Sequence, residues 1–299
     1  MQKETVKNIV LAIIACLLWS TAFVGIKIGL QYTTPIQFAG LRFFFSGLLL
    51  LPLVKSLSNY FRAIRQNFWL IIKVSATQTF ILYALFYWGV DMLDGALAAI
   101  IIGSQPLFAA LTAHVMMSND KMSLRKTLTI SSGIGGIILI ALPKGLSGPD
   151  NWSELLGILL LVMANIASGI GNVFVSKNRG SISPIILNSS QMIIGGAFLF
   201  IFSLFTEPFN GFRFPVEYYV ALTWLSFLSA TAFSLWFFLL QKPTIKVSDL
   251  NIYKFIIPVF GATLSWIILP DESPDFTSLL GMLIIGASVV LYSLIATKN

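Results

Sequence analysis

Ten apolar segments, each close to the length that crosses a bilayer, constrain this 299-residue chain more than any other feature of its sequence. A hydrocarbon core needs about 20 predominantly apolar residues per spanning helix. Runs of this kind occupy residues 8–30, 35–54, 68–90, 94–117, 127–142, 153–176, 184–205, 216–241, 247–268 and 277–296. Because 57% of the residues are hydrophobic and only 10% are charged, we expect an all-α integral membrane protein with ten transmembrane helices and short connections.

The positions of the basic residues predict the orientation of these helices. If the N-terminus is cytoplasmic, 13 of the 19 Lys and Arg residues fall in inside loops and 2 fall in outside loops. This bias follows the positive-inside rule, and a miscounted helix would invert half of it. We therefore expect a multi-pass protein of the cell (inner) membrane with both termini cytoplasmic. Its basic residues would face anionic lipid headgroups, so they need no nucleic-acid partner.

The two halves of the sequence resemble each other. The segment that begins at Pro35 aligns with the segment that begins at Pro184, and the segment around Pro106 aligns with the segment around Pro258. The offset between matched positions is near 150 throughout. This constant offset indicates an internal duplication.

In the segments around Pro106 and Pro258, an acidic residue follows 14 positions after the proline. These residues are Asp120 and Glu272. Because each half holds five helices, an odd number, the second copy must enter the membrane upside down. Inverted repeats are common in secondary transporters, whose substrate site lies near the midplane at the repeat interface. We predict one five-helix repeat over 8–142, a linker over 143–152 and a second repeat over 153–296.

Several of these segments resemble the EamA family of the drug/metabolite transporter superfamily. They are LLWSTAFVGIK (17–27), PIQFAGLRF (35–43), YALFYWGV (83–90), the Pro106 segment with Asp120 and the Pro258 segment with Glu272. The resemblance covers nearly the whole chain and implies two five-helix units that export small metabolites, often amino acids, or drugs. The chain departs from the family pattern where Trp19-Ser20 replaces Trp-Gly and where Asn119-Asp120 replaces Gly-Glu.

Two prolines predict distorted helices at symmetry-related depths. A proline removes one helical hydrogen bond and frees the carbonyl four residues before it, which belongs to Ile102 for Pro106 and to Lys254 for Pro258. A freed carbonyl is tolerated in a membrane only where protein or a wet cavity satisfies it. We predict a gating or structural role for both prolines beside a central cavity, against the alternative of buried kinks.

Lys254 is the cation that most needs an explanation. It lies about seven residues into its predicted span, and an ammonium near the bilayer centre is unfavourable by on the order of 3 kcal/mol. Its side chain either reaches back to the cytoplasmic headgroups or points into the central cavity, where it would bind a carboxylate or titrate. Asn251 and Tyr253 would then lie close to it.

Other polar and aromatic residues within the predicted spans are candidates for the same cavity. They are Trp19, Gln78, Tyr83, Tyr87, Gln105, Asn165 and Trp236. Such residues also hold membrane helices together without binding substrate. Arg42 has a structural role or contributes to gating or substrate contact.

The acidic residues that fall within the predicted spans, Asp94, Glu154, Glu217 and Asp249, all lie in the first three positions of a span, so we expect no Asp or Glu deep in the membrane. This pattern disfavours the small multidrug exporters of the superfamily, which use a membrane-embedded Glu. The embedded cations favour an anionic or zwitterionic small molecule, exported by alternating access without a cofactor, by a monomer or a homodimer. Drug or nucleotide-sugar-like cargo is the alternative. An intramembrane enzyme or a non-transporting receptor is less favoured, because one Cys, one His and no embedded acid leave few catalytic groups.

Overall fold

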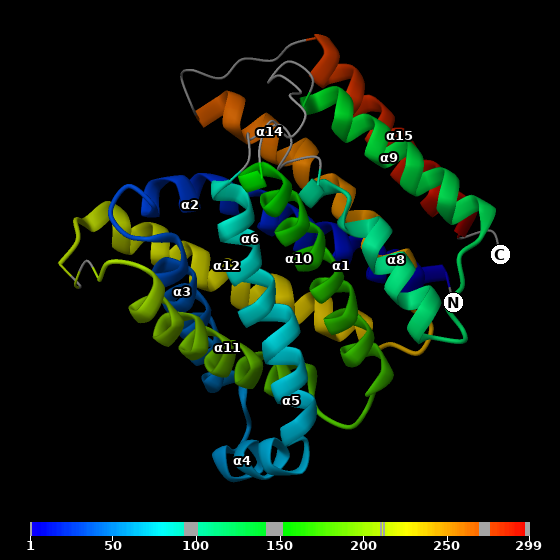
Figure 1. The fold of residues 1–299 in the computed structure, drawn as a ribbon. Coiled ribbons are helices and arrows are strands. Elements are labelled where there is room, and N and C mark those ends of the chain that lie inside the picture. Colours follow the sequence, from blue (N-terminus) through cyan, green and yellow to red (C-terminus); the bar gives the residue numbers. More distant parts are fainter. Residues whose placement is uncertain are drawn as a thin grey trace.

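The structure is a computed structural model that describes residues 2–92, 101–141, 152–209, 211, 213–268 and 276–296. All regular secondary structure in these ranges is helical (Figure 1). The helices bounded there are α1 (Gln2–Ser20), α2 (Ala22–Gly29), α3 (Pro35–Leu49), η1 (Leu51–Leu53), α4 (Leu57–Gln66), α5 (Phe68–Ser75), η2 (Ala76–Phe80), α6 (Ile81–Asp91), α8 (Gln105–Met116), α9 (Leu124–Ala141), α10 (Trp152–Lys177), α11 (Pro184–Thr206), α12 (Val216–Leu240), α13 (Val247–Ile252), η4 (Tyr253–Phe255), α14 (Ile256–Ile268) and α15 (Phe276–Ala296).

Six helical segments of the described chain are long and apolar enough to cross a membrane. They are Lys3–Gly29, Pro35–Leu53, Phe68–Asp91, Leu155–Lys177, Pro184–Thr206 and Val216–Leu240. Each coincides with one of the ten predicted spans. The other four predicted spans are helical over most of their described residues, and the last of them contains a shorter apolar helix, Leu279–Val290. Glu272 and most of the predicted linker lie outside the described residues.

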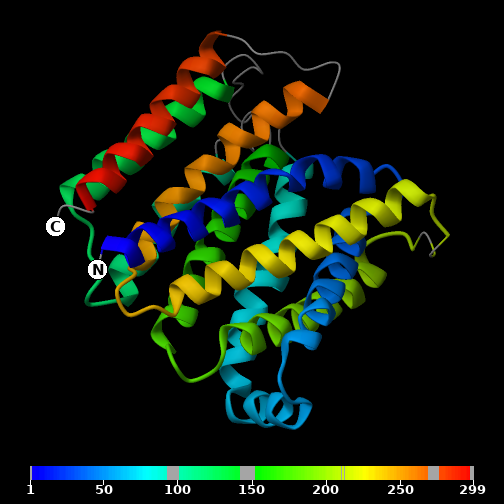
Figure 2. The ribbon, with the colours of Figure 1, turned by 180° about the vertical axis from the view of Figure 1, so that it is seen from behind.

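The most extensive helix contacts join elements that are far apart in the chain. Helix α3 packs along α11, α9 along α15, α10 against α6 and α8, and α1 against α12 and α14 (Figures 1 and 2). Each of these pairs joins one helix that ends by Ala141 to one that begins at or after Trp152. The N-terminal and C-terminal helices are therefore interleaved around one core.

Small residues let α3 and α11 approach closely. A Cβ at Gly47 would lie 2.7 Å from the carbonyl oxygen of Ser189, and a Cβ at Gly196 would overlap the backbone nitrogen of Phe44. Gly40 likewise has no room for a Cβ, which would lie 2.5 Å from the backbone nitrogen of Phe200. Such small residues are typical of membrane helices whose backbones touch.

Three helices depart from α geometry beside the same cavity. Residues 76–80 form a π-helical turn within the third span, helix α8 begins with Gln105-Pro106 after a break at Ser104, and Tyr253–Phe255 form a 3-10 turn before Pro258. Such irregular turns often mark functional sites. The two prolines thus lie beside interruptions in their helices, and their role in gating stays a prediction.

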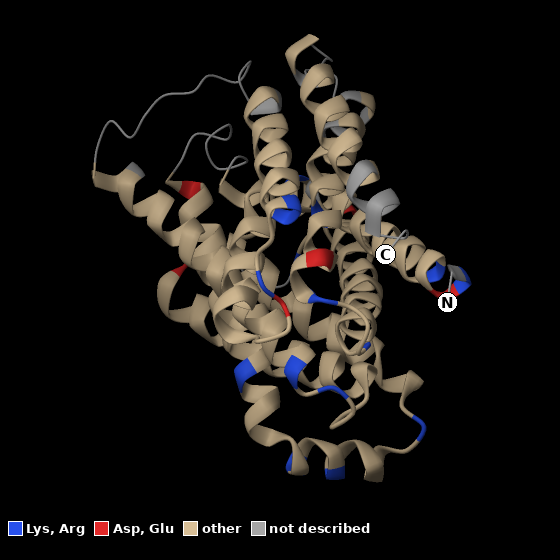
Figure 3. Cartoon of the chain, turned by 90° about the vertical axis from the view of Figure 1, so that its right-hand side faces the viewer, with Lys and Arg blue, Asp and Glu red and all other residues tan. Residues whose placement is uncertain are grey.

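Helix α4 is one element that the sequence analysis placed within a connection. Ser56 caps it, since the Ser56 hydroxyl accepts a hydrogen bond from the backbone N–H of Asn59 at 3.4 Å. Leu57 and Phe61 are exposed next to basic residues of the same helix, a pattern typical of helices that lie in the membrane interface. Figure 3 shows basic residues at the bottom of the view, where α4 lies, and also at mid-height, beside the N-terminus. We call the side of the molecule that carries α4, the N-terminus and the connections with Lys121 and Lys242 the basic end.

Candidate functional site

A cavity of about 150 Å³ lies in the middle of the helices, where the irregular turns meet. Aromatic side chains form much of its wall: Trp19, Tyr83, Phe86, Phe233 and Trp236. The polar and charged side chains on the wall are Arg42, Gln78, Gln105, Asn165, Ser168 and Lys254. Two of these are cations, and no Asp or Glu of the described residues lines the cavity. An apolar chamber with a few polar groups is the usual form of a small-molecule site.

A larger hollow of about 570 Å³ lies elsewhere, between α2 and α12. Its wall is mainly apolar and includes Val24, Ile28 and Val220, with Gln31 and Glu217 as polar members. It contains neither embedded cation. Because polar groups fix the orientation of a ligand, the smaller central cavity is the better candidate for the functional site.

Lys254 points into the central cavity rather than back to the membrane surface. Its ammonium donates a hydrogen bond to Oε1 of Gln105 at 2.7 Å. It also lies 4.9 Å from the ring centroid of Trp236 and 5.5 Å from that of Trp19. Both distances are within the range of cation–π attraction. The 3-10 turn that carries Lys254 and the break before Gln105 bring the two side chains together from different helices.

The break before α8 exposes a carbonyl that a side chain satisfies. The carbonyl oxygen of Ile101 accepts hydrogen bonds from Nδ2 of Asn165 at 2.6 Å and from the hydroxyl of Ser104 at 2.6 Å. Asn165 thus supports the interrupted helix as well as lining the cavity. The satisfied carbonyl lies one residue before Ile102, the residue that the proline rule indicated.

Asn172 is the centre of a buried hydrogen-bond network next to the cavity. Its Oδ1 accepts from Nε2 of Gln78 at 3.0 Å and from Nε1 of Trp236 at 3.3 Å. Its Nδ2 donates to Oδ1 of Asn251 at 3.2 Å, and Asn251 in turn donates to the carbonyl of Val247 at 2.9 Å. Asn172 and Asn251 are fully buried. The network joins the π-turn, α10, α12 and α13 through one side chain.

We expect Asn172→Ala to lower the free energy of unfolding by about 2 kcal/mol, because the substitution leaves buried partners of Asn172 without their hydrogen bonds. Unfolding in mixed micelles with increasing SDS would measure the change. Asn178→Ala is the matched control, since Asn178 directly follows the last residue of α10 and its side chain donates to the carbonyl of Phe174 four residues back. Equal stability of the two variants would contradict a central role for Asn172.

Arg42 is almost completely buried, with 2% of its surface exposed. Its Nε donates to the hydroxyl of Ser229 at 2.9 Å, and its guanidinium carbon lies 4.9 Å from the centre of the Phe43 ring. Its backbone carbonyl accepts from the hydroxyl of Ser226 at 3.2 Å. Arg42 therefore ties α3 to α12 while it also reaches the cavity wall.

Seven of the ten residues predicted to bind substrate lie on the cavity wall: Trp19, Gln78, Tyr83, Gln105, Asn165, Trp236 and Lys254. Three do not. Asn251 bonds to Asn172 behind the wall, Tyr253 is buried in the 3-10 turn, and Tyr87 packs against Tyr83 and Phe86. Whether the seven contact a substrate stays a prediction.

The sequence analysis missed two aromatic wall residues. Phe233 precedes Trp236 by one helical turn, so it shares a face of α12 with it, and its ring lies 5.1 Å from that of Trp19. Phe86 follows Tyr83 at the same spacing, with ring centroids 6.1 Å apart. Each lies three residues from a predicted site residue on the same helix, and this spacing could have indicated both.

Comparison with known families decides the general class of the protein. The model of the EamA-like transporter family matches residues 6–142 and again residues 155–294. The chain belongs to the EamA-like transporter family. Membership supports transport rather than catalysis as the role of this membrane protein.

Curated relatives of this EamA-like chain are named as transporters. The chain is 26% identical over 277 residues to the uncharacterized transporter YvbV of Bacillus subtilis, covering 92% of this chain and 88% of the relative. It is 27% identical over 290 residues to an uncharacterized transporter of Archaeoglobus fulgidus, covering 95% and 96%. It is 23% identical over 286 residues to the S-adenosylmethionine/S-adenosylhomocysteine transporter of Chlamydia muridarum, covering 92% and 88%.

One solved crystal structure has the same fold as this EamA-like chain. The TM-score is 0.83, the two chains are 14% identical, and the match covers 98% of each. At this level of identity the likeness extends to the fold alone.

Proposed function

We propose that this EamA-like protein exports a small zwitterionic or anionic metabolite, such as an amino acid, by alternating access through the central cavity. The observation that carries the proposal is the Lys254 ammonium, which contacts Gln105 and two indole rings inside the cavity. An ammonium with neutral partners in an apolar chamber favours a ligand that brings a carboxylate. A volume of about 150 Å³ also suits a small metabolite, because drug-sized ligands occupy pockets of roughly 300–1,000 Å³.

The proposal includes two inverted five-helix repeats, with ten spans, over 8–142 and 153–296. Two hydrogen bonds support it. Arg42 bonds to Ser229 at 2.9 Å, and Gln191, which lies 149 positions after Arg42, bonds to Thr79 at 2.6 Å. Ser229 itself lies 150 positions after Thr79. A two-fold relation between the halves explains why these two bonds correspond.

Repeat-related residues also occur together on the wall of the same cavity. Ile102 corresponds to Lys254, and Gln105 corresponds to Ile257, when Pro106 is matched to Pro258. All four of these side chains line the cavity. In each match one residue is polar and the other is apolar. The proposed site is therefore asymmetric, although the two repeats that form it are related by symmetry.

The basic end is proposed to face the cytoplasm of a cell whose inner membrane holds the protein. The positive-inside rule supports this orientation. It places the N-terminus, α4 and the start of α13 on the cytoplasmic side. A monomer or a homodimer is compatible with the cavity, since one chain supplies the whole wall.

The experiment that tests the proposal compares cells that express the protein with cells that carry an empty vector. Both are loaded with dipeptides that cytosolic peptidases convert to amino acids, and the medium is analysed by mass spectrometry. We expect amino acids or other carboxylates to accumulate in the medium faster when the protein is present. Equal accumulation of all small carboxylates would contradict export of this class.

A second candidate cargo is an S-adenosyl amino acid, which the Chlamydia relative's name indicates for that protein. The aromatic walls of the cavity favour it, since Trp19, Phe233 and Trp236 offer stacking surfaces. Such a compound is larger than the cavity as it stands. Uptake of radiolabelled S-adenosylhomocysteine by proteoliposomes, with and without the protein, separates this candidate from a free amino acid.

A further inference from the structure

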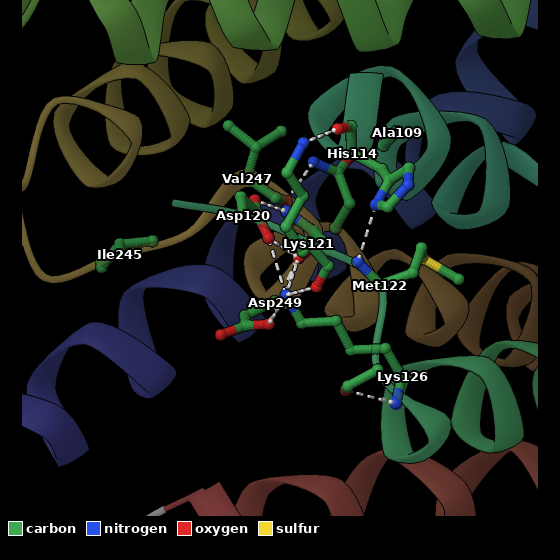
Figure 4. A network of polar contacts seen from close by, with 12 residues as sticks. Ala109, His114, Asp120, Lys121, Met122, Lys126, Ile245, Val247 and Asp249 are labelled. Atoms are coloured by element: carbon green, nitrogen blue, oxygen red, sulfur yellow. Dashed lines mark hydrogen bonds and ion pairs between the residues drawn. The ribbon is translucent and has the colours of Figure 1, made fainter. Parts of the chain in front are cut away.

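A buried polar cluster joins the connection after α8 to the start of α13 (Figure 4). Asp120 is fully buried. Its Oδ2 accepts a hydrogen bond from the backbone N–H of Ser248 at 2.9 Å, and its Oδ1 accepts from the Ser248 hydroxyl and from Nζ of Lys126 at 2.6 Å. Lys126 also lies 3.0 Å from Oδ1 of Asp249. We call Asp120, Lys126, Ser248 and Asp249 the Asp120 cluster.

The connection that carries Asp120 is itself held against α8. The backbone N–H of Met122 donates to Nδ1 of His114 at 3.1 Å, and Nζ of Lys121 donates to the carbonyl of His114 at 2.7 Å (Figure 4). Asp120 is therefore fixed relative to the end of α8. Its contact with Ser248 bridges 128 positions of sequence.

The cluster lies between the cavity and the basic end. Helix α8 begins at Gln105 on the cavity wall and ends near Asp120, whereas α13 begins beside Asp120 and leads to Lys254 on the wall. The two helices pack on each other between these points. Ala113 on α8 and Val247 on α13 have no exposed surface. The space between the two helices is therefore filled at this point.

The chemistry of the Asp120 cluster allows it to hold α13 against α8 and also to release it. Burial alone raises the pKa of Asp120, but hydrogen bonds from Lys126 and Ser248 outweigh it and hold the pKa below its usual value. The carboxylate is therefore charged at neutral pH, and charge-assisted hydrogen bonds are stronger than neutral ones. The Ser248 N–H lies in the first turn of α13, where a helix has no acceptor of its own. Water can replace Asp120 there once the helices part.

We propose that Asp120 and Lys126 are positioning residues that form the cytoplasmic gate of the transport path. They hold α13 against α8 and so keep the cavity closed toward the basic end. The path opens in that direction when Ser248 separates from Asp120. The inference rests on the proposed function, because a gate is needed only if a cargo enters the cavity from one side of the membrane and leaves to the other.

The test measures access to the cavity from each side of the membrane. Cys16, which is buried and is the one cysteine of the chain, is replaced by Ala, and Ser168→Cys supplies a reporter thiol on the cavity wall. A membrane-impermeant methanethiosulfonate is then added to inside-out and to right-side-out vesicles. With Asp120→Asn we expect about tenfold faster labelling from the cytoplasmic side, since hydrogen bonds to a charged group are lost.

Matched variants test whether the loss of the Asp120 carboxylate causes the faster labelling. Asp120→Glu keeps the carboxylate and is expected to restore the slow rate. Ser248→Ala keeps both charges and is expected to give a smaller increase in the same direction. Glu4→Gln removes an exposed carboxylate that pairs with Lys242 at 3.2 Å, away from the Asp120 cluster, and is expected to leave the rate unchanged.

Two outcomes would overturn the gate. One is an unchanged cytoplasmic rate in Asp120→Asn with the protein still inserted. The other is equal acceleration from both sides, which indicates general loosening rather than a gate. Labelling requires no cargo, so its result is independent of the export assay and a failure of either can be told from a failure of the other.

Discussion

Replacement of Lys254 by Met is expected to lower the rate of export by about a hundredfold or more, because it removes the ammonium that we propose binds the carboxylate of the cargo. The methionine keeps a stem of similar length. It also removes a charge that is unfavourable within the bilayer, so membrane insertion should be intact or improved. The measurement is the initial rate of export from proteoliposomes loaded with the amino acid that the wild type carries best.

Two further variants make the Lys254 result specific. Lys254→Arg keeps the positive charge but changes its geometry, so we expect partial activity. Lys73→Met removes an ammonium from an exposed position of α5, where it lies 5.8 Å from the ring of Phe174, and should transport at the wild-type rate. Normal export by Lys254→Met would show that the ammonium serves packing rather than binding.

Substitution of Gly196 by Val is expected to destabilise the protein by about 3 kcal/mol or more, which is the upper range for overpacked sites. No side chain fits at this position, because a Cβ would overlap the backbone of Phe44 and come within 2.9 Å of the carbonyl oxygen of Gly40. Backbone atoms cannot move aside as a flexible side chain does. Helices α3 and α11 must therefore separate, and the readout is the SDS fraction at which the protein unfolds in mixed micelles.

Gly286→Val is the matched control for this substitution. Gly286 also lies within a helix, α15, but a Cβ there would meet nothing within 4 Å. We expect little change in stability. If both variants unfold at the same SDS fraction, the close approach of α3 and α11 does not limit stability.

The positions of the long helices could be predicted because the length of each apolar run can be read from the sequence alone. Pro35 and Pro184 were predicted to begin their spans, and the helices α3 and α11 begin at these residues. The π-turn at 76–80 and the 3-10 turn at Tyr253–Phe255 could not be predicted in the same way. These turns depend on which backbone groups find partners in neighbouring helices, and only the fold decides that.

The cavity residues could be predicted where a polar side chain stands within an otherwise apolar span. Lys254 and Gln105 attracted notice for this reason, and the fold brings them to 2.7 Å. Asn172 lies on the same helix as Asn165 but was not among the predicted site residues. Its central place depends on three other helices that supply Gln78, Trp236 and Asn251. Spacing along one helix contains no information about those partners.

The interleaving of early and late helices has a consequence for biosynthesis. While the ribosome is still making the later residues, the helices up to Ala141 have already entered the bilayer without the partners they contact most, α10, α11, α12 and α15. Lipid must occupy the faces of α3 and α9 that later receive α11 and α15. We expect a nascent chain in this condition to be susceptible to membrane proteases, and a premature stop codon near the middle of the gene to leave a product that cannot complete its core.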